Sequence, residues 1–123
     1  MALNFLLEGH ELIVNIFGKK HPTYITSINN LSIAYSYLEK YDKSLKLDLE
    51  RLSITEKIFG KENPSYANAL INLAGSYANL GNYKKSLELN SEALLIREKE
   101  IGKKDFFVWE DNVWSIGKPE LNL

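Results

Sequence analysis

The chain has 123 residues, a length typical of a single domain. Hydrophobic residues make up 45% and charged residues 25%, which are the proportions of a globular protein and not of a disordered one. The net charge of −1 argues against a nucleic-acid partner, since such proteins carry a basic excess, and the absence of cysteine excludes disulfides, zinc–thiolate sites and thiol nucleophiles.

The beginning of the chain does not predict an export or membrane segment. Residues 2–7 are mostly apolar, but no basic segment leads them and Glu8 follows directly. No apolar run reaches the roughly 18 residues that a membrane-spanning helix needs. We therefore expect a cytoplasmic protein with no membrane partner.

A 42-residue internal repeat dominates the sequence. The segment Phe17-Gly18-Lys19-Lys20-His21-Pro22 recurs as Phe59-Gly60-Lys61-Glu62-Asn63-Pro64. Aligning residues 17–58 with residues 59–100 gives 19 identities in 42 positions. Such self-similarity is typical of repeat architectures, in which each unit is one supersecondary element.

The first predicted elements are a single helix over residues 2–17 and a helix pair over residues 21–60. Leu12 aligns with Ile54, so residues 2–17 match the second helix of a unit. Apolar residues spaced three, four and three apart predict the first helix of the pair, and a second stripe that ends at Gly60 predicts its partner. The two stripes are Ile28, Leu31, Tyr35 and Leu38, then Leu45, Leu49, Leu52 and Ile54.

The same pattern predicts a second pair over residues 63–102. Pro64 opens its first helix, Gly81 suits the turn, and Gly102 is expected to end the second helix as Gly60 does. Because one pair cannot bury its apolar stripes alone, neighbouring pairs must stack. The stripes of this pair are Leu70, Leu73, Tyr77 and Leu80, then Leu87, Leu94 and Ile96.

The end of the chain predicts a modified closing helix over residues 105–117. Phe106, Trp109, Val113 and Ile116 form a stripe at spacings of three, four and three, which is suited to a cap. The whole chain, residues 1–123, is thus predicted to be one all-α domain of about six helices.

The unit Asn72-Leu73-Ala74-x-x-Tyr77-x-x-x-Gly81-x-Tyr83 resembles the tetratricopeptide repeat signature. The 42-residue period is longer than the usual 34 or so. With Gly60-x-x-Asn63-Pro64 before the first helix and Leu95-Ile96-Arg97-Glu98-Lys99 in the second, the unit looks like the kinesin-light-chain type. The resemblance implies a right-handed α-solenoid of antiparallel helix pairs.

The sequence also departs from that family. Asp48 and Asn90 stand where a bulky apolar residue is usual, and Arg51 replaces an alanine. We therefore expect looser or more polar packing between consecutive pairs. Gly75 lies inside a predicted helix, where we expect it to permit close approach of the neighbouring helix rather than of a ligand.

The resemblance implies a protein or peptide partner, held in the concave groove that the first helix of each pair lines. An amide offers both a donor and an acceptor to a peptide backbone, so Asn30 and Asn72 are the foremost candidates, with bonding inside the solenoid as the alternative. Tyr37, the one tyrosine of seven without a partner 42 residues away, is a candidate anchor or else merely exposed. The remaining candidates are Thr26, Asn29, Ile33, Asn68, Ile71 and Asn79.

No catalytic or metal-binding arrangement is recognisable in the sequence. His10 and His21 have no suitably spaced carboxylate or second histidine, and no Ser-His-Asp set or phosphate-binding glycine loop occurs. We therefore predict a binding protein with no enzyme activity, no cofactor and no metal.

Two other functions stay open on the sequence alone. Half-units at both ends leave apolar faces that a second copy could cover, which would make the chain a homo-oligomer. The chain could also serve as a regulatory module attached to an effector domain or enzyme in a larger protein.

Overall fold

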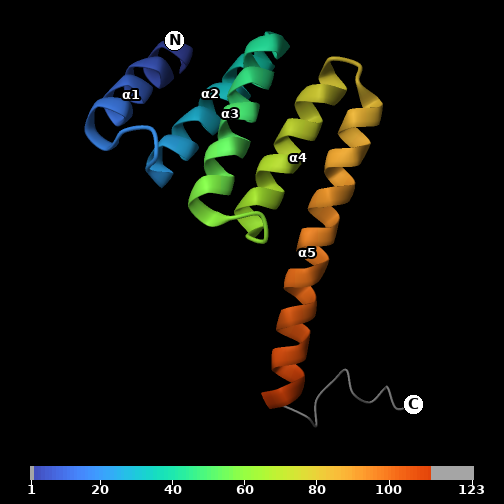
Figure 1. The fold of residues 1–123 in the computed structure, drawn as a ribbon. Helices are drawn as coiled ribbons and strands as arrows, with labels where there is room; N and C mark the ends of the chain where they lie inside the picture. Colours follow the sequence, from blue (N-terminus) through green and yellow to red (C-terminus); the bar gives the residue numbers. More distant parts are fainter. Residues whose placement is uncertain (1, 112–123) are drawn as a thin grey trace.

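The computed structural model describes residues 2–111, and the side chains of residues 3–102. That part of the chain forms five helices: α1 (Ala2–Phe17), α2 (Pro22–Tyr37), α3 (Tyr41–Phe59), α4 (Pro64–Asn79) and α5 (Tyr83–Asp111). They stand side by side in chain order, each antiparallel to the one before (Figure 1). Extensive contacts join only successive helices. The all-helical solenoid that the sequence predicted is confirmed.

The helix starts follow from local chemistry that the repeat duplicates. Pro22 and Pro64 occupy the first turns of α2 and α4, where the missing N–H is not needed. The residue before each proline caps the helix: His21 Nδ1 accepts the N–H of Thr23 at 3.1 Å, and Asn63 Oδ1 accepts that of Ser65 at 2.8 Å. His21 thus has a structural role.

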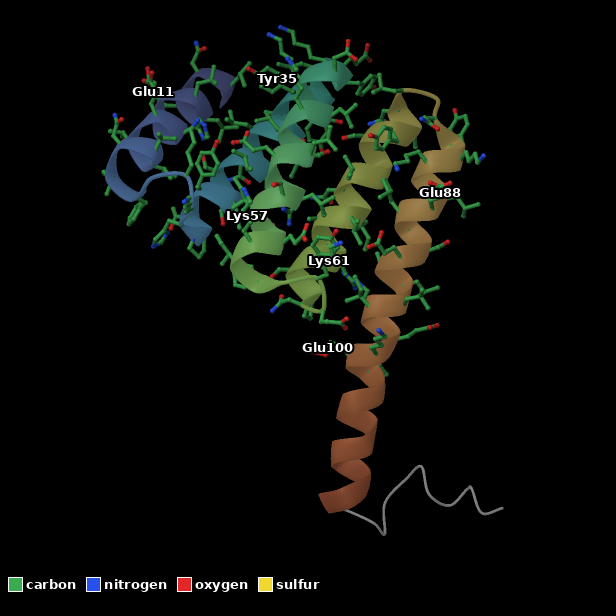
Figure 2. All side chains as sticks on the ribbon, in the orientation of Figure 1. Glu11, Tyr35, Lys57, Lys61, Glu88 and Glu100 are labelled. Atoms are coloured by element: carbon green, nitrogen blue, oxygen red, sulfur yellow. The ribbon has the colours of Figure 1, made fainter. Side chains whose placement is uncertain are left out.

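The main apolar core lies where α3, α4 and α5 meet. Leu70 and Leu73 of α4 are almost fully buried, and Ala93 of α5 packs against them. The α1 end is more open, with Phe5, Leu12 and Ile16 largely exposed. Charged side chains such as those labelled Glu11, Lys57 and Glu88 lie on the outside of the array (Figure 2).

The predicted apolar stripe of α5 is only partly right. Ile96 is buried as expected, but Leu87 and Leu94 are 68% and 57% exposed, and Leu89 and Ala93 are buried in their place. The equivalent residues of α3, Leu45 and Leu52, pack against the core because α3 has a helix on each side. Among the described helices, α5 has a neighbour on one side only, so its other apolar residues stay uncovered.

The prediction that Gly102 ends the helix is wrong. Helix α5 runs through Gly102 to Asp111, so residues 105–111 of the predicted closing helix continue α5 and do not start a separate element. Gly60 has a φ of +85°, whereas Gly102 has no such left-handed φ, and no capping residue and proline follow it. Glycine alone therefore does not end a helix here. Residues 112–117 of the prediction lie outside the described residues.

The α2–α3 and α4–α5 turns each place one residue in the left-handed region, at equivalent positions of the repeat. Gly81, in the α4–α5 turn, has a φ of +86°, and Glu39, its equivalent in the α2–α3 turn, has a φ of +60°. A residue with a Cβ is strained in this left-handed conformation, whereas glycine is not.

Replacing Glu39 with glycine should therefore stabilise the protein. We expect Glu39→Gly to raise the free energy of unfolding by about 1 kcal/mol, measured by urea denaturation. As a control, Glu88→Gly inside α5 should lower it by about the same amount, because glycine is unfavourable within a helix. A loss of stability in Glu39→Gly would show that the turn does not strain its backbone.

Candidate partner-binding groove

A groove of about 380 Å³ opens between α2 and α4, with α3 at its base. This central groove combines a polar floor, half-exposed apolar walls and amide groups. Its lining residues are Ser32, Ile33, Ser36, Tyr37, Ser44, Asp48, Ile71, Asn72, Gly75, Ser76 and Asn79.

A buried hydrogen-bonded cluster forms the floor. Asp48 of α3 is 3% exposed, and both of its carboxylate oxygens accept hydroxyl hydrogen bonds. Ser32 Oγ of α2 donates to Oδ1 at 2.6 Å, and Ser76 Oγ of α4 donates to Oδ2. Because Ser32 uses its proton on Asp48, Ser44 is the donor in the 2.8 Å contact between Ser44 Oγ and Ser32 Oγ. The cluster therefore ties three helices together at the base of the groove.

Burial also changes the proton affinity of this cluster. Desolvation raises the pKa of Asp48, and the hydrogen bonds from Ser32 and Ser76, with the charge of Arg51, oppose that rise only in part. The expectation of more polar packing between consecutive pairs is thus confirmed at Asp48, where a charged group replaces an apolar contact.

A second polar link joins α2 to α4 beside the floor. Asn29 Oδ1 accepts hydrogen bonds from Asn72 Nδ2 at 2.8 Å and from Arg51 Nη1 at 2.7 Å. Asn72 is therefore bonded within the solenoid, as the alternative reading of that residue foresaw. It also lines the groove, and among the described residues only one of its amide hydrogens is engaged, so the rest of the amide can meet a ligand.

The structure places the predicted site residues in three settings. The central groove brings together Ile33, Tyr37, Ile71, Asn72 and Asn79. Two asparagines serve internal bonds: Asn29 as above, and Asn68, whose Oδ1 accepts a hydrogen bond from Arg97. Asn30 and Thr26 lie beside α1 in other cavities, so Asn30 and Asn72 do not share one groove.

The interpretation of Gly75 is corrected by its surroundings. A Cβ built at this position would meet no atom within 4 Å, so no neighbouring helix approaches it closely. Gly75 instead lines the groove and leaves it wide at that point. The sequence analysis also missed Ser32 and Ser76 as floor residues. Asp48 at a position normally apolar was the signal that polar partners had to lie opposite.

The described residues contain no group of three or more histidine, aspartate or glutamate side chains placed to hold a metal ion. Between residues 2 and 111, no helix has both the length and the apolar character to cross a lipid bilayer.

One known family matches the part of the chain that contains α3, α4 and most of α5. The family model described as tetratricopeptide repeat matches residues 35–99, more than half of the chain. The chain belongs to the tetratricopeptide repeat family.

One known relative also carries the tetratricopeptide repeat in its name. The chain is 32% identical over 56 residues to the mitochondrial tetratricopeptide repeat protein 19 homolog of Drosophila melanogaster, covering 46% of this chain and 15% of that protein. The chain thus spans only a small part of the length of this relative.

Two solved structures share the fold. One is a kinesin-light-chain-type protein of Podosopora anserina with nearly identical TPR-like repeats (TM-score 0.75, 22% identity, 80% of this chain and 47% of that one). The other is BtubC (BKLC) from P. vanneervenii (TM-score 0.73, 22% identity, 80% and 40%). The resemblance to kinesin-light-chain-like repeats that the sequence predicted is confirmed.

The raised pKa of Asp48 predicts an unusual pH dependence of stability. A raised pKa in the folded state means that folding favours the protonated acid, so the contribution of Asp48 is fully present below its ordinary pKa of 3.8 and is lost as pH rises through the raised value. Relative to Asp48→Asn, which does not titrate, the unaltered protein should therefore gain stability as the pH is lowered from neutral toward 3.8.

Urea denaturation of both proteins across this pH range measures the difference. Glu88→Gln, which removes an exposed carboxylate, serves as the control. If acidification instead favours Asp48→Asn, the serine hydrogen bonds outweigh desolvation and the account of the floor is wrong.

Proposed function

We propose that the chain binds an extended peptide segment of another protein in the central groove. Tetratricopeptide repeats generally mediate protein–protein interactions, through the concave surfaces that stacked repeats create. The single observation that carries the proposal is the wide stretch at Gly75, flanked by half-exposed apolar walls and by free amide capacity on Asn72.

The lining supports a particular kind of peptide. Ile33 and Ile71, 45% and 38% exposed, offer apolar contact on opposite sides of the groove. Tyr37 is 86% exposed at the rim, where a tyrosine ring gives rigid contact area at low entropic cost. The amides of Asn72 and Asn79 suit a peptide backbone, which carries one donor and one acceptor per residue.

The charge of the groove lining restricts which peptides can bind. No lysine or arginine lines the groove, and Asp48 is the one carboxylate among its lining residues. An acidic peptide would find no counter-charge there. We therefore propose a peptide with apolar or aromatic side chains and without acidic residues in the bound stretch. A binding role without catalysis, and a cytoplasmic location, remain predictions from the sequence.

Filling the groove at Gly75 tests the proposal. Gly75→Leu places a bulky side chain in open groove space while improving the helix, so the fold should be retained. Peptides selected on the unaltered chain from a random-peptide display library should bind Gly75→Leu at least about tenfold more weakly, since a filled site loses its main contacts. Fluorescence anisotropy with a labelled selected peptide measures the affinities.

The matched control is Gly102→Leu, the same exchange at an exposed helical glycine outside the groove. It should leave peptide affinity unchanged. The proposal fails if selection enriches no peptide, or if the enriched peptides bind Gly75→Leu as tightly as the unaltered chain.

A further inference from the structure

A second, more apolar groove lies at the α1 end of the array. It has a volume of about 660 Å³ and opens between α1 and α2. Leu3 and Leu6 of α1 and Ala34 and Leu38 of α2 line it. No described helix occupies this end groove.

The internal repeat shows what kind of element the end groove fits. Shifting by 42 residues places Leu6 on Asp48 and Ala34 on Ser76, two residues of the central groove. Ser32 of α2 donates a hydrogen bond to Asp48, so α2 packs against the surface that contains Asp48. The end groove is the equivalent surface one repeat earlier in the chain. It is therefore the place of a first helix that would pair with α1.

Leu6 and Ala34 stand where the central groove has Asp48 and Ser76, and this difference determines which kind of helix the end groove can accept. Where Ser32 of α2 meets the buried carboxylate of Asp48, beside the hydroxyl of Ser76, an occupant of the end groove would meet Leu6 beside Ala34. Polar side chains would be left without partners there, at a cost of roughly 1–3 kcal/mol for each buried group. The occupant must be a helix with an apolar stripe.

The C-terminal end of the chain has the matching character. Residues 105–117 align with residues 63–75, the first-helix part of a repeat, and carry Phe106, Trp109, Val113 and Ile116 at helical spacing. Helix α5 extends well beyond the end of α4 in Figure 1, on the side of the array opposite α1. The apolar 105–117 segment, whose residues 105–111 continue α5, and the end groove beside α1 therefore lie at opposite ends of the array.

We propose that residues 105–117 of one copy fill the end groove of a second copy. The contact is head-to-tail, because the two surfaces are different and lie at opposite ends of one chain. The inserted segment takes the place of the first helix of the repeat in which α1 is the second helix. Ile33 and Tyr37 line both grooves, whereas Ala34 and Leu38 line the end groove and not the central one, so changes at Ala34 and Leu38 test this proposal separately from peptide binding.

Complementation between two full-length variants tests the proposal. Ala34→Glu places a charge in the end groove, and a chain with both Phe106→Glu and Trp109→Glu carries charges in the inserting segment. Sedimentation equilibrium should show the unaltered chain increasing in mass with concentration above its 14.1 kDa monomer. Each variant alone should remain a monomer.

An equimolar mixture of the two variants should form a dimer of one copy of each, because it contains one intact groove and one intact segment. Circular dichroism checks that each variant is folded. If Ala34→Glu is not, Leu38→Glu at a 51% exposed position replaces it. The proposal is overturned if the unaltered chain stays monomeric at every concentration, if either variant associates as well as the unaltered chain, or if the mixture stays monomeric.

Discussion

The structure depends on one constraint: each helix can bury its apolar side only against the helices next to it in the chain. Extensive contacts join successive helices alone, so burial is set by the number of neighbours. Leu45 and Leu52 on α3 pack into the core, while their equivalents Leu87 and Leu94 on α5 are mostly exposed. The same sequence pattern thus yields core in the middle of the array and an open surface at its end.

Polar contacts hold the two walls of the central groove in place. The carboxylate of Asp48 is buried, which is costly unless its oxygens are satisfied, and the hydroxyls of Ser32 and Ser76 satisfy them from opposite sides. Since one serine lies on α2 and the other on α4, the carboxylate links both walls through α3. The bond from Asn72 to Asn29 adds a second link between the walls. A wholly apolar floor would offer no comparably directional contact.

The repeat allowed the helices to be predicted closely, because a proline opens the first helix of each pair and glycines such as Gly60 and Gly81 mark turns. It could not show which unit is the last. Gly102 was therefore expected to act like Gly60, although the capping residue and proline that follow Gly60 are absent after it. Similarly, Leu87 belongs to the predicted apolar stripe but is 68% exposed, whereas its repeat partner Leu45 is partly buried against the core.

The groove was predictable in part for the same reason. Ile71, Asn72 and Asn79 follow from the face of one helix, whereas the cavity that a residue enters depends on its neighbours in space. Asn30 and Asn72 are equivalent in sequence, yet Asn30 faces α1 and Asn72 faces Asn29 of α2. Serines are common on both surfaces and interiors of helices, so Ser32 and Ser76 gave no signal without the position of Asp48.

Native-state hydrogen exchange, followed by mass spectrometry at low protein concentration, tests the neighbour constraint most directly. If burial follows the number of adjacent helices, amides of α2, α3 and α4 should exchange slowest, and those of α1 and of the final turns of α5 fastest. Equal protection along all five helices, or greatest protection in α1, would contradict the account.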